Sequence, residues 1–142
     1  MRLTSFTDYG LRALMRMAGE PERPLSTAEL AREFGLSRNH LTKIMQRLAA
    51  GGVVATRRGG SGGATLARNP GDIRLGTVVR LLEEGQALVE CFARGGGDCT
   101  IAGCCRLKRR LHSAEAAFLA ELDRATLADI ALSPRAPEWV GP

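Results

Sequence analysis

The chain has 142 residues, of which 44% are hydrophobic, and a formal net charge of +5. A chain of this length buries one hydrophobic core, so a single compact unit is expected. Charged residues interrupt the apolar runs before they reach the roughly 20 residues of a membrane-spanning helix, and the N-terminus has no signal-peptide pattern. We therefore expect a cytoplasmic protein without a membrane segment, in a compartment where cysteines stay reduced.

The excess positive charge lies in the first half of the chain. Residues 1–72 contain eleven Lys or Arg against six Asp or Glu, whereas residues 73–142 contain nine of each. No acidic residue occurs between Glu33 and Asp72. Because ordinary surfaces mix both signs, this acid-free block indicates a surface that contacts nucleic-acid phosphates.

A first helix is predicted from Ser5 to about Gly19. A capping box of Ser5 and Asp8 opens it, and apolar residues follow at the spacing of one buried face. From this local pattern alone, Asp8 is a first-turn carboxylate that stabilises the helix dipole. The apolar residues are Leu11, Leu14, Met15 and Ala18.

Two further helices form a predicted helix-turn-helix motif. Ser26 is expected to cap a helix over residues 27–34, and Ser37 a helix over residues 38–50. Gly35 provides a left-handed conformation in the turn between them. The second helix has an apolar and a polar side, as a recognition helix in the DNA major groove requires. Its expected DNA contacts are Ser37, Arg38, Asn39, His40, Lys43 and Arg47.

A β-hairpin is predicted after these helices, with strands over residues 53–57 and 64–68. A glycine-rich loop can also bind nucleotide phosphates, but the Gly-Lys-Ser/Thr sequence that would lead into a helix is missing. A hairpin at this place is typical of the wing of a winged helix, whose tip contacts the minor groove. The expected wing contacts are Arg57, Arg58, Gly59 and Gly60.

The second half contains two predicted helices. A short one over residues 77–84 is expected to pack on the DNA-binding unit. A long one over residues 105–132 has an apolar seam that favours a partner helix in a symmetric dimer. Such a dimer presents two recognition helices to an inverted repeat. The seam residues are Leu107, Leu111, Ala114, Phe118, Leu122 and Ala125.

All four cysteines lie within the glycine-rich stretch 91–105. Thiolates at this density favour a soft metal ion or an iron-sulfur cluster. A zinc site, a thiol sensor, a disulfide loop and an electron-transfer protein are the alternatives that the cysteines alone leave open. The predicted helix-turn-helix would have no role in an electron-transfer protein. No catalytic triad, paired acids or cofactor fingerprint indicates an enzyme.

Four segments resemble a known family of regulators. They are MRLTSFTDYGLRAL at residues 1–14, GLSRNHLTKI at 35–44, RGGSGG at 58–63 and CRLK at 105–108. In these segments the chain is similar to the IscR/NsrR-type winged-helix regulators, and in particular to their nitric-oxide-sensing repressors. Lys108 supports this choice, because a histidine occupies its position in the cluster-status regulators of the family.

The resemblance implies a homodimeric repressor with an iron-sulfur cluster, the 4Fe-4S form being favoured over the 2Fe-2S form. The implied metal ligands are Cys91, Cys99 and Cys105, with Asp8 supplied by the other subunit. The seven residues between Cys91 and Cys99 exceed the usual interval of the family. Cys104 has no counterpart in the family and competes with Cys105 as a candidate ligand, although the alignment favours Cys105.

Nitric oxide is the implied signal, and nitrosylation of the cluster would release the dimer from an inverted-repeat operator in double-stranded DNA. The alternative is a regulator of the same family that senses redox or iron-sulfur status through a cluster, zinc or thiols. The expected fold is mainly α: a winged helix-turn-helix with a small β-hairpin wing and a long C-terminal dimerisation helix. We expect a DNA-binding domain at residues 1–76, the cluster loop and dimerisation helix at 77–132, and a flexible tail at 133–142.

Overall fold

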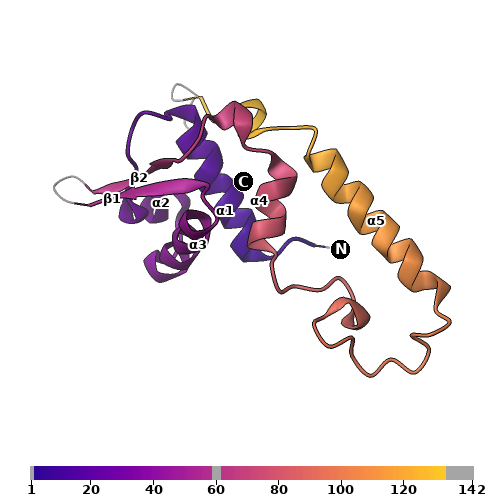
Figure 1. The fold of residues 1–142 in the computed structure, drawn as a ribbon. Coiled ribbons are helices and arrows are strands. Elements are labelled where there is room, and N and C mark those ends of the chain that lie inside the picture. Colours follow the sequence, from indigo (N-terminus) through magenta and orange to yellow (C-terminus); the bar gives the residue numbers. More distant parts are fainter. Residues whose placement is uncertain (1, 59–61, 134–142) are drawn as a thin grey trace.

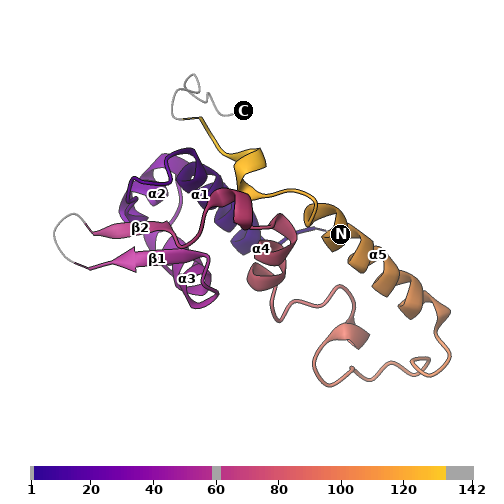
Figure 2. The same ribbon diagram turned by 45° about the horizontal axis from the view of Figure 1, so that its top comes forward.

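The computed structural model describes residues 2–58 and 62–133. Four helices and a β-hairpin form one unit, and α5 runs beside α4 on the side opposite the hairpin (Figure 1). Figure 2 shows the same arrangement from a second direction, with the cysteine-containing segment looping out between α4 and α5. The elements are α1 (Ser5–Gly19), α2 (Thr27–Phe34), α3 (Arg38–Ala50), β1 (Val54–Arg57), β2 (Gly63–Leu66), η1 (Pro70–Asp72), α4 (Leu75–Leu82), η2 (Glu90–Phe92), α5 (Arg106–Leu122) and η3 (Leu127–Ile130).

This architecture confirms the predicted fold class, which is mainly helical with a two-stranded wing. Two of the predictions fall on parts of the chain outside the described residues. They are the wing-tip contacts Gly59 and Gly60, and the tail from residue 134 onward. The division at residue 76 stays a prediction.

The helix-turn-helix forms as predicted. The hydroxyls of Ser26 and Ser37 cap α2 and α3, each accepting a hydrogen bond from a backbone N–H three residues further on. Gly35 ends α2 with a φ of 65°, a left-handed conformation that favours glycine. The residues that α3 buries in the core are Leu41, Ile44, Met45 and Leu48.

The start of α1 differs from the prediction. Thr4, and not Ser5, is the N-cap, and its hydroxyl accepts a hydrogen bond from the backbone N–H of Thr7 at 3.3 Å. The hydroxyl and the backbone N–H of Thr4 also donate to one carboxylate oxygen of Glu83, each at 2.8 Å. The predicted capping box at Ser5 is therefore wrong, because the cap is fixed by a residue 79 positions away. Asp8 lies in the first turn, as predicted.

The hydrophobic core lies between α1, α2, α3 and α4. Leu14, Leu30, Ile44 and Val78, one from each helix, are fully buried in it. α4 packs on the unit as expected, although it spans Leu75–Leu82 instead of residues 77–84. α1, α2 and α4 thus hold α3 in a fixed orientation.

The β-hairpin is attached to the helices through Leu25. β1 and β2 pair antiparallel, with Arg57 opposite Gly63. Leu25 and Ala64 exchange two backbone hydrogen bonds, at 2.9 and 3.0 Å. The strands are slightly shorter than predicted, since β1 begins at Val54 and β2 ends at residue 66.

The C-terminal helix is shorter than predicted. α5 ends at Leu122, ten residues before the predicted end at 132. The next residue, Asp123, binds Arg80 of α4, and the hydrogen bond and charge of Arg80 hold the pKa of Asp123 below its ordinary range. Leu127 is fully buried, and its N–H donates to the carbonyl of Ile73 at 3.0 Å. The chain after α5 therefore returns to the core, which ends the helix.

Candidate nucleic-acid interface and cysteine loop

The first turn of α3 presents polar side chains away from the core. Arg38, Asn39 and Lys43 are exposed, whereas the opposite side of the helix is buried. Ser37 accepts from the backbone N–H of His40, so its hydroxyl is partly engaged by the helix start. Arginine and asparagine at this end of a helix have the donor geometry that reads guanine and adenine edges. α3 therefore has the surface of a recognition helix.

Two of the DNA contacts predicted on α3 pack partly against α1. The His40 ring is half-buried and packs against Tyr9, with ring centroids 5.5 Å apart, and against Phe6 at 6.1 Å. Arg47 is also half-buried, with its guanidinium 5.7 Å from the Phe6 ring centroid. Sequence periodicity places both residues on the polar side but does not show that Phe6 and Tyr9 of α1 cover this edge.

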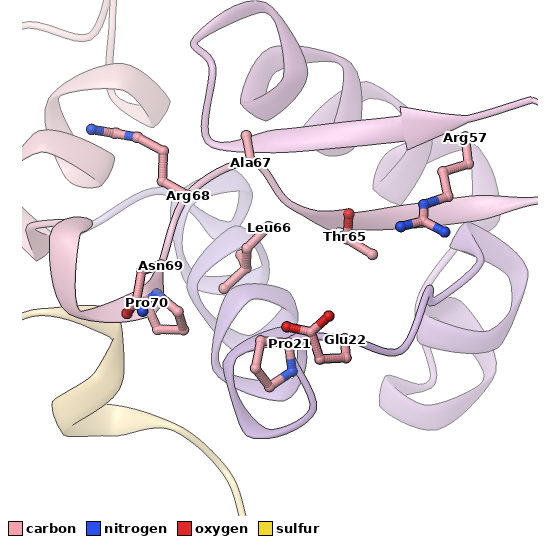
Figure 3. Close-up of a pocket in the computed structure, with 9 residues that line it drawn as sticks. All are labelled: Pro21, Glu22, Arg57, Thr65, Leu66, Ala67, Arg68, Asn69 and Pro70. Atoms are coloured by element: carbon pink, nitrogen blue, oxygen red, sulfur yellow. The ribbon is translucent and has the colours of Figure 1, made fainter.

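The wing adds two exposed arginines. Arg57 ends β1, and Arg58 follows it. Beside the hairpin lies an open cavity of about 400 Å³, into which both Arg57 and Glu22 extend, while Arg68 points the other way (Figure 3). Because a carboxylate shares this cavity with the arginine, the cavity itself is not a cationic site. The exposed arginines remain available to DNA.

The structure does not bring the predicted metal ligands to one point. Cys91 and Cys105 are half-buried, whereas Cys99 and Cys104 are exposed, and all four are free thiols. Among residues 2–58 and 62–133, no three His, Cys, Asp or Glu side chains lie close enough to hold a metal ion. Asp8, with 48% of its side chain exposed, instead pairs with Arg12 at 2.9 and 3.1 Å.

The two ends of the cysteine loop are nevertheless anchored. Cys105 is the N-cap of α5, where its sulfur accepts a hydrogen bond from the backbone N–H of Lys108 at 3.4 Å. Next to Cys91, the Phe92 ring stacks on His112 of α5, with centroids 3.8 Å apart. Nothing in the local sequence pattern indicates this stack, because Phe92 and His112 are 20 positions apart. A cysteine three residues before a helical N–H, in contrast, is a recognisable cap position.

The middle of the loop has an adaptable backbone. Gly95, Gly96 and Gly97 all have positive φ angles, between 62° and 95°. Three thiols on a loop with anchored ends and a glycine-rich middle fit the chemistry of an iron-sulfur cluster, which takes cysteine thiolates as ligands. Cys104 belongs less clearly to this set, because its thiol donates to the carbonyl of Ile101 at 3.6 Å.

The apolar seam of α5 is only partly covered within the chain, where Leu122 and Ala125 pack against the core. α5 has no buried residue, and 62% of Leu107 is exposed. Ile101, in the loop before it, is 56% exposed. Exposed large apolar residues, here one on α5 and one in the loop before it, are typical of interaction surfaces. None of the helices in the described part of the chain is long and apolar enough to cross a bilayer.

Comparison with known proteins identifies the family. A sequence model of the Rrf2 family, described as an iron-dependent transcriptional regulator, matches residues 3–132. The chain belongs to the Rrf2 family. It is therefore a transcriptional regulator and not an enzyme, as its sequence motifs indicated.

Individual Rrf2 relatives agree with this assignment. The chain is 43% identical over 131 residues to the HTH-type transcriptional regulator NsrR of Geobacillus kaustophilus, covering 92% of this chain and 89% of the relative. It is 42% identical over 134 residues to NsrR of Shouchella clausii, covering 94% and 90%. The predicted resemblance is confirmed.

Solved structures confirm the Rrf2 fold. IscR of T. potens superimposes with a TM-score of 0.70 at 28% identity, covering 92% of this chain and 85% of that one. CymR, the global cysteine regulator of B. subtilis, superimposes with a TM-score of 0.72 at 27% identity, covering 92% and 96%. Both span the winged helix and the C-terminal helix.

Proposed function

We propose that the chain is a homodimeric repressor that binds an inverted-repeat operator and is released when nitric oxide reaches an iron-sulfur cluster. The observation that carries this proposal is its likeness to regulators named NsrR, at 42–43% identity along more than nine-tenths of the chain. The candidate ligands of a cluster are also present. As a DNA-binding transcriptional regulator, it would act in the cytoplasm.

In this proposal α3 reads the operator. Arg38 and Asn39 contact base edges in the major groove, and Lys43, one turn further on, contacts a phosphate. Arg57 and Arg58, with Gly59 and Gly60, contact the backbone or the minor groove from the wing. The exposure of the first three side chains and of both arginines supports this assignment.

A second copy of the chain covers the α5 seam. Leu107, Leu111 and Phe118 lie on one side of a helix that buries none of its residues in its own chain. Burying such a seam against a partner helix removes apolar surface from water at about 25 cal/mol per Å². Two-fold symmetry then presents two α3 helices to the two halves of an inverted repeat.

Cys91, Cys99 and Cys105 hold the proposed cluster, together with Asp8 of the partner subunit. A bound cluster, with the 4Fe-4S type favoured, would supply iron that reacts with nitric oxide, and a carboxylate ligand such as Asp8 would be more exchangeable than a thiolate. Asp8 makes a two-point ion pair with Arg12 within its own helix. This pair gives the Asp8 carboxylate an alternative partner, so α1 retains a stable arrangement when Asp8 is not a ligand.

A thiol-based sensor is the second candidate. All four thiols are free, and two of them are exposed. The fold also matches CymR, a cysteine regulator. In this alternative the signal acts on the thiols themselves, with Cys99 and Cys104 the most accessible, and no metal is required. A regulator that binds zinc would, like the thiol sensor, have no visible absorbance.

Anaerobic reconstitution with iron and sulfide tests the proposal. The reconstituted protein is expected to absorb in the visible region and to bind operator DNA more tightly than the same protein without iron. Cys105→Ser should lose both properties. A protein that stays colourless after reconstitution and binds DNA equally well before and after would contradict the cluster and favour the thiol or zinc sensor.

A further inference from the structure

The last turn of α4 is held by both α1 and α3. From α1, Thr4 donates two hydrogen bonds of 2.8 Å to Glu83. From α3, the Nη1 of Arg47 donates to the carbonyl oxygen of Leu81 at 3.3 Å. Arg47 also lies 4.0 Å from a carboxylate oxygen of Glu84. Contacts at Leu81, Glu83 and Glu84 therefore fix the end of α4 to α1 and α3.

This turn leads directly into the cysteine loop. Gly85 follows Glu84 with a φ of 86°, and Cys91 comes only six residues after Gly85. If the start of the loop moves, the contacts at residues 81–84 are therefore the first to change. On α3, Arg47 donates the hydrogen bond to this turn, so its position would change with the loop.

Arg47 also reaches the DNA-reading end of α3 through α1. The Cζ of its guanidinium lies 5.7 Å from the centroid of the Phe6 ring. The same ring packs against His40, with ring centroids 6.1 Å apart. His40 stands in the first turn of α3, beside the exposed Arg38 and Asn39. The Phe6 ring thus contacts both Arg47, which binds the end of α4, and His40 in the first turn of the recognition helix.

We propose that Arg47 is a positioning residue that couples the cysteine loop to the recognition helix of the same subunit, and that it is not a phosphate contact. The inference rests on the proposed function, because it presumes that the loop changes state. It adds a coupling pathway within each subunit to the proposed coupling between subunits through Asp8. It gives Arg47 a different role from the DNA contact expected from the sequence.

The charge environment of Arg47 supports this role. A cation that binds a DNA phosphate releases counterions condensed on the DNA, which favours binding. Arg47 instead donates to a carbonyl oxygen and lies over an aromatic face, with the exposed carboxylate of Glu84 4.0 Å away, so its guanidinium is already engaged within the protein. Lys43, on the same helix, is exposed and forms no ion pair within the described residues. Lys43 is therefore the matched comparison.

The test measures how operator affinity depends on salt for Arg47→Gln and Lys43→Gln, each with and without cluster. Removing one phosphate contact lowers the slope of log affinity against log salt by about 0.9. We expect this fall for Lys43→Gln and an unchanged slope for Arg47→Gln. We also expect Arg47→Gln to reduce the ratio of cluster-loaded to cluster-free affinity by about three- to thirtyfold, and Lys43→Gln to leave that ratio unchanged.

Arg47→Lys keeps the test decisive if Arg47→Gln does not fold. Lysine retains the charge of a phosphate contact but not the forked guanidinium that reaches a carbonyl and an aromatic ring together. A positioning role therefore predicts a reduced affinity ratio for Arg47→Lys, at a helix content equal to the wild type. A wild-type ratio in either variant, or a lowered salt slope in Arg47→Gln, would overturn the inference. A wild-type protein whose affinity does not depend on the cluster would instead overturn the proposed function.

Discussion

Arg80 and Asp123 join α4 to the end of α5 through two hydrogen bonds, of 2.7 and 3.0 Å. Gly76 lies at the same junction, on the first turn of α4. A Cβ atom at Gly76 would collide with the Asp123 carboxylate and lie 2.7 Å from the carbonyl oxygen of Leu119. The position of α5 against the DNA-binding unit therefore depends on the absence of a side chain at Gly76.

Gly76→Ala is expected to destabilise the fold. Alanine normally stabilises a helix interior by about 0.5–1 kcal/mol relative to glycine, but overpacking costs about 1–3 kcal/mol. The overpacking cost should dominate here, because one of the obstacles is backbone and the other is held by Arg80. Urea unfolding measures the difference. Gly103→Ala is the control, since nothing lies within 4 Å of its Cβ position, and it should change stability by less than about 0.5 kcal/mol. Equal effects of the two variants would contradict the packing argument.

Arg38→Ala is expected to weaken specific operator binding by about 1–3 kcal/mol and to relax the preference at one base pair. The reason is that an exposed arginine in the first turn of a recognition helix reads guanine. Binding to a panel of single-base operator variants measures both effects. Arg124→Ala removes the same charge from an exposed site after α5 and should leave specificity unchanged. A uniform loss of affinity across the panel would make Arg38 a phosphate contact instead.

Leu107→Asp is expected to convert the dimer to a monomer. This leucine is 62% exposed in the single chain, so a charge there should spare the monomer fold while preventing burial against a partner helix. Sedimentation equilibrium measures the mass. Ala116→Asp places the same charge on α5 away from the seam, at another exposed position, and should remain dimeric. If both variants stay dimeric, the α5 seam is not the dimer interface.

Cys105→Ser should lose the cluster, whereas Cys104→Ser should keep it. Serine is a good N-cap, so Cys105→Ser preserves the start of α5 and isolates the loss of a thiolate ligand. Visible absorbance after anaerobic reconstitution, together with iron and sulfide content, measures retention. The reverse pattern, with colour lost only in Cys104→Ser, would assign the third ligand to Cys104.

Local features were predicted well because their causes are local. Ser26, Gly35 and Ser37 define the helix-turn-helix through contacts within three residues. The errors arose where distant residues decide the structure. Glu83 selects Thr4 as the cap of α1. The contact of Arg47 with Phe6 of α1 is likewise a long-range feature that periodicity did not indicate.

The end of α5 shows the same limit. Apolar periodicity continues past Leu122, but Arg80 holds Asp123, and Leu127 is buried in the core. The candidate cluster ligands are a different case. Cysteine density indicated a thiolate site, and the structure adds that Cys105 caps α5. The proposed convergence of these ligands would require a metal and a second subunit, neither of which sequence periodicity describes.

An anaerobic titration with nitric oxide tests the central claim most directly. Visible absorbance and operator binding are followed in the same samples of reconstituted protein. We expect the cluster absorbance and the DNA affinity to fall together as nitric oxide is added. DNA binding that stays constant while the absorbance is lost, or a protein without cluster absorbance whose binding ignores nitric oxide, would contradict it.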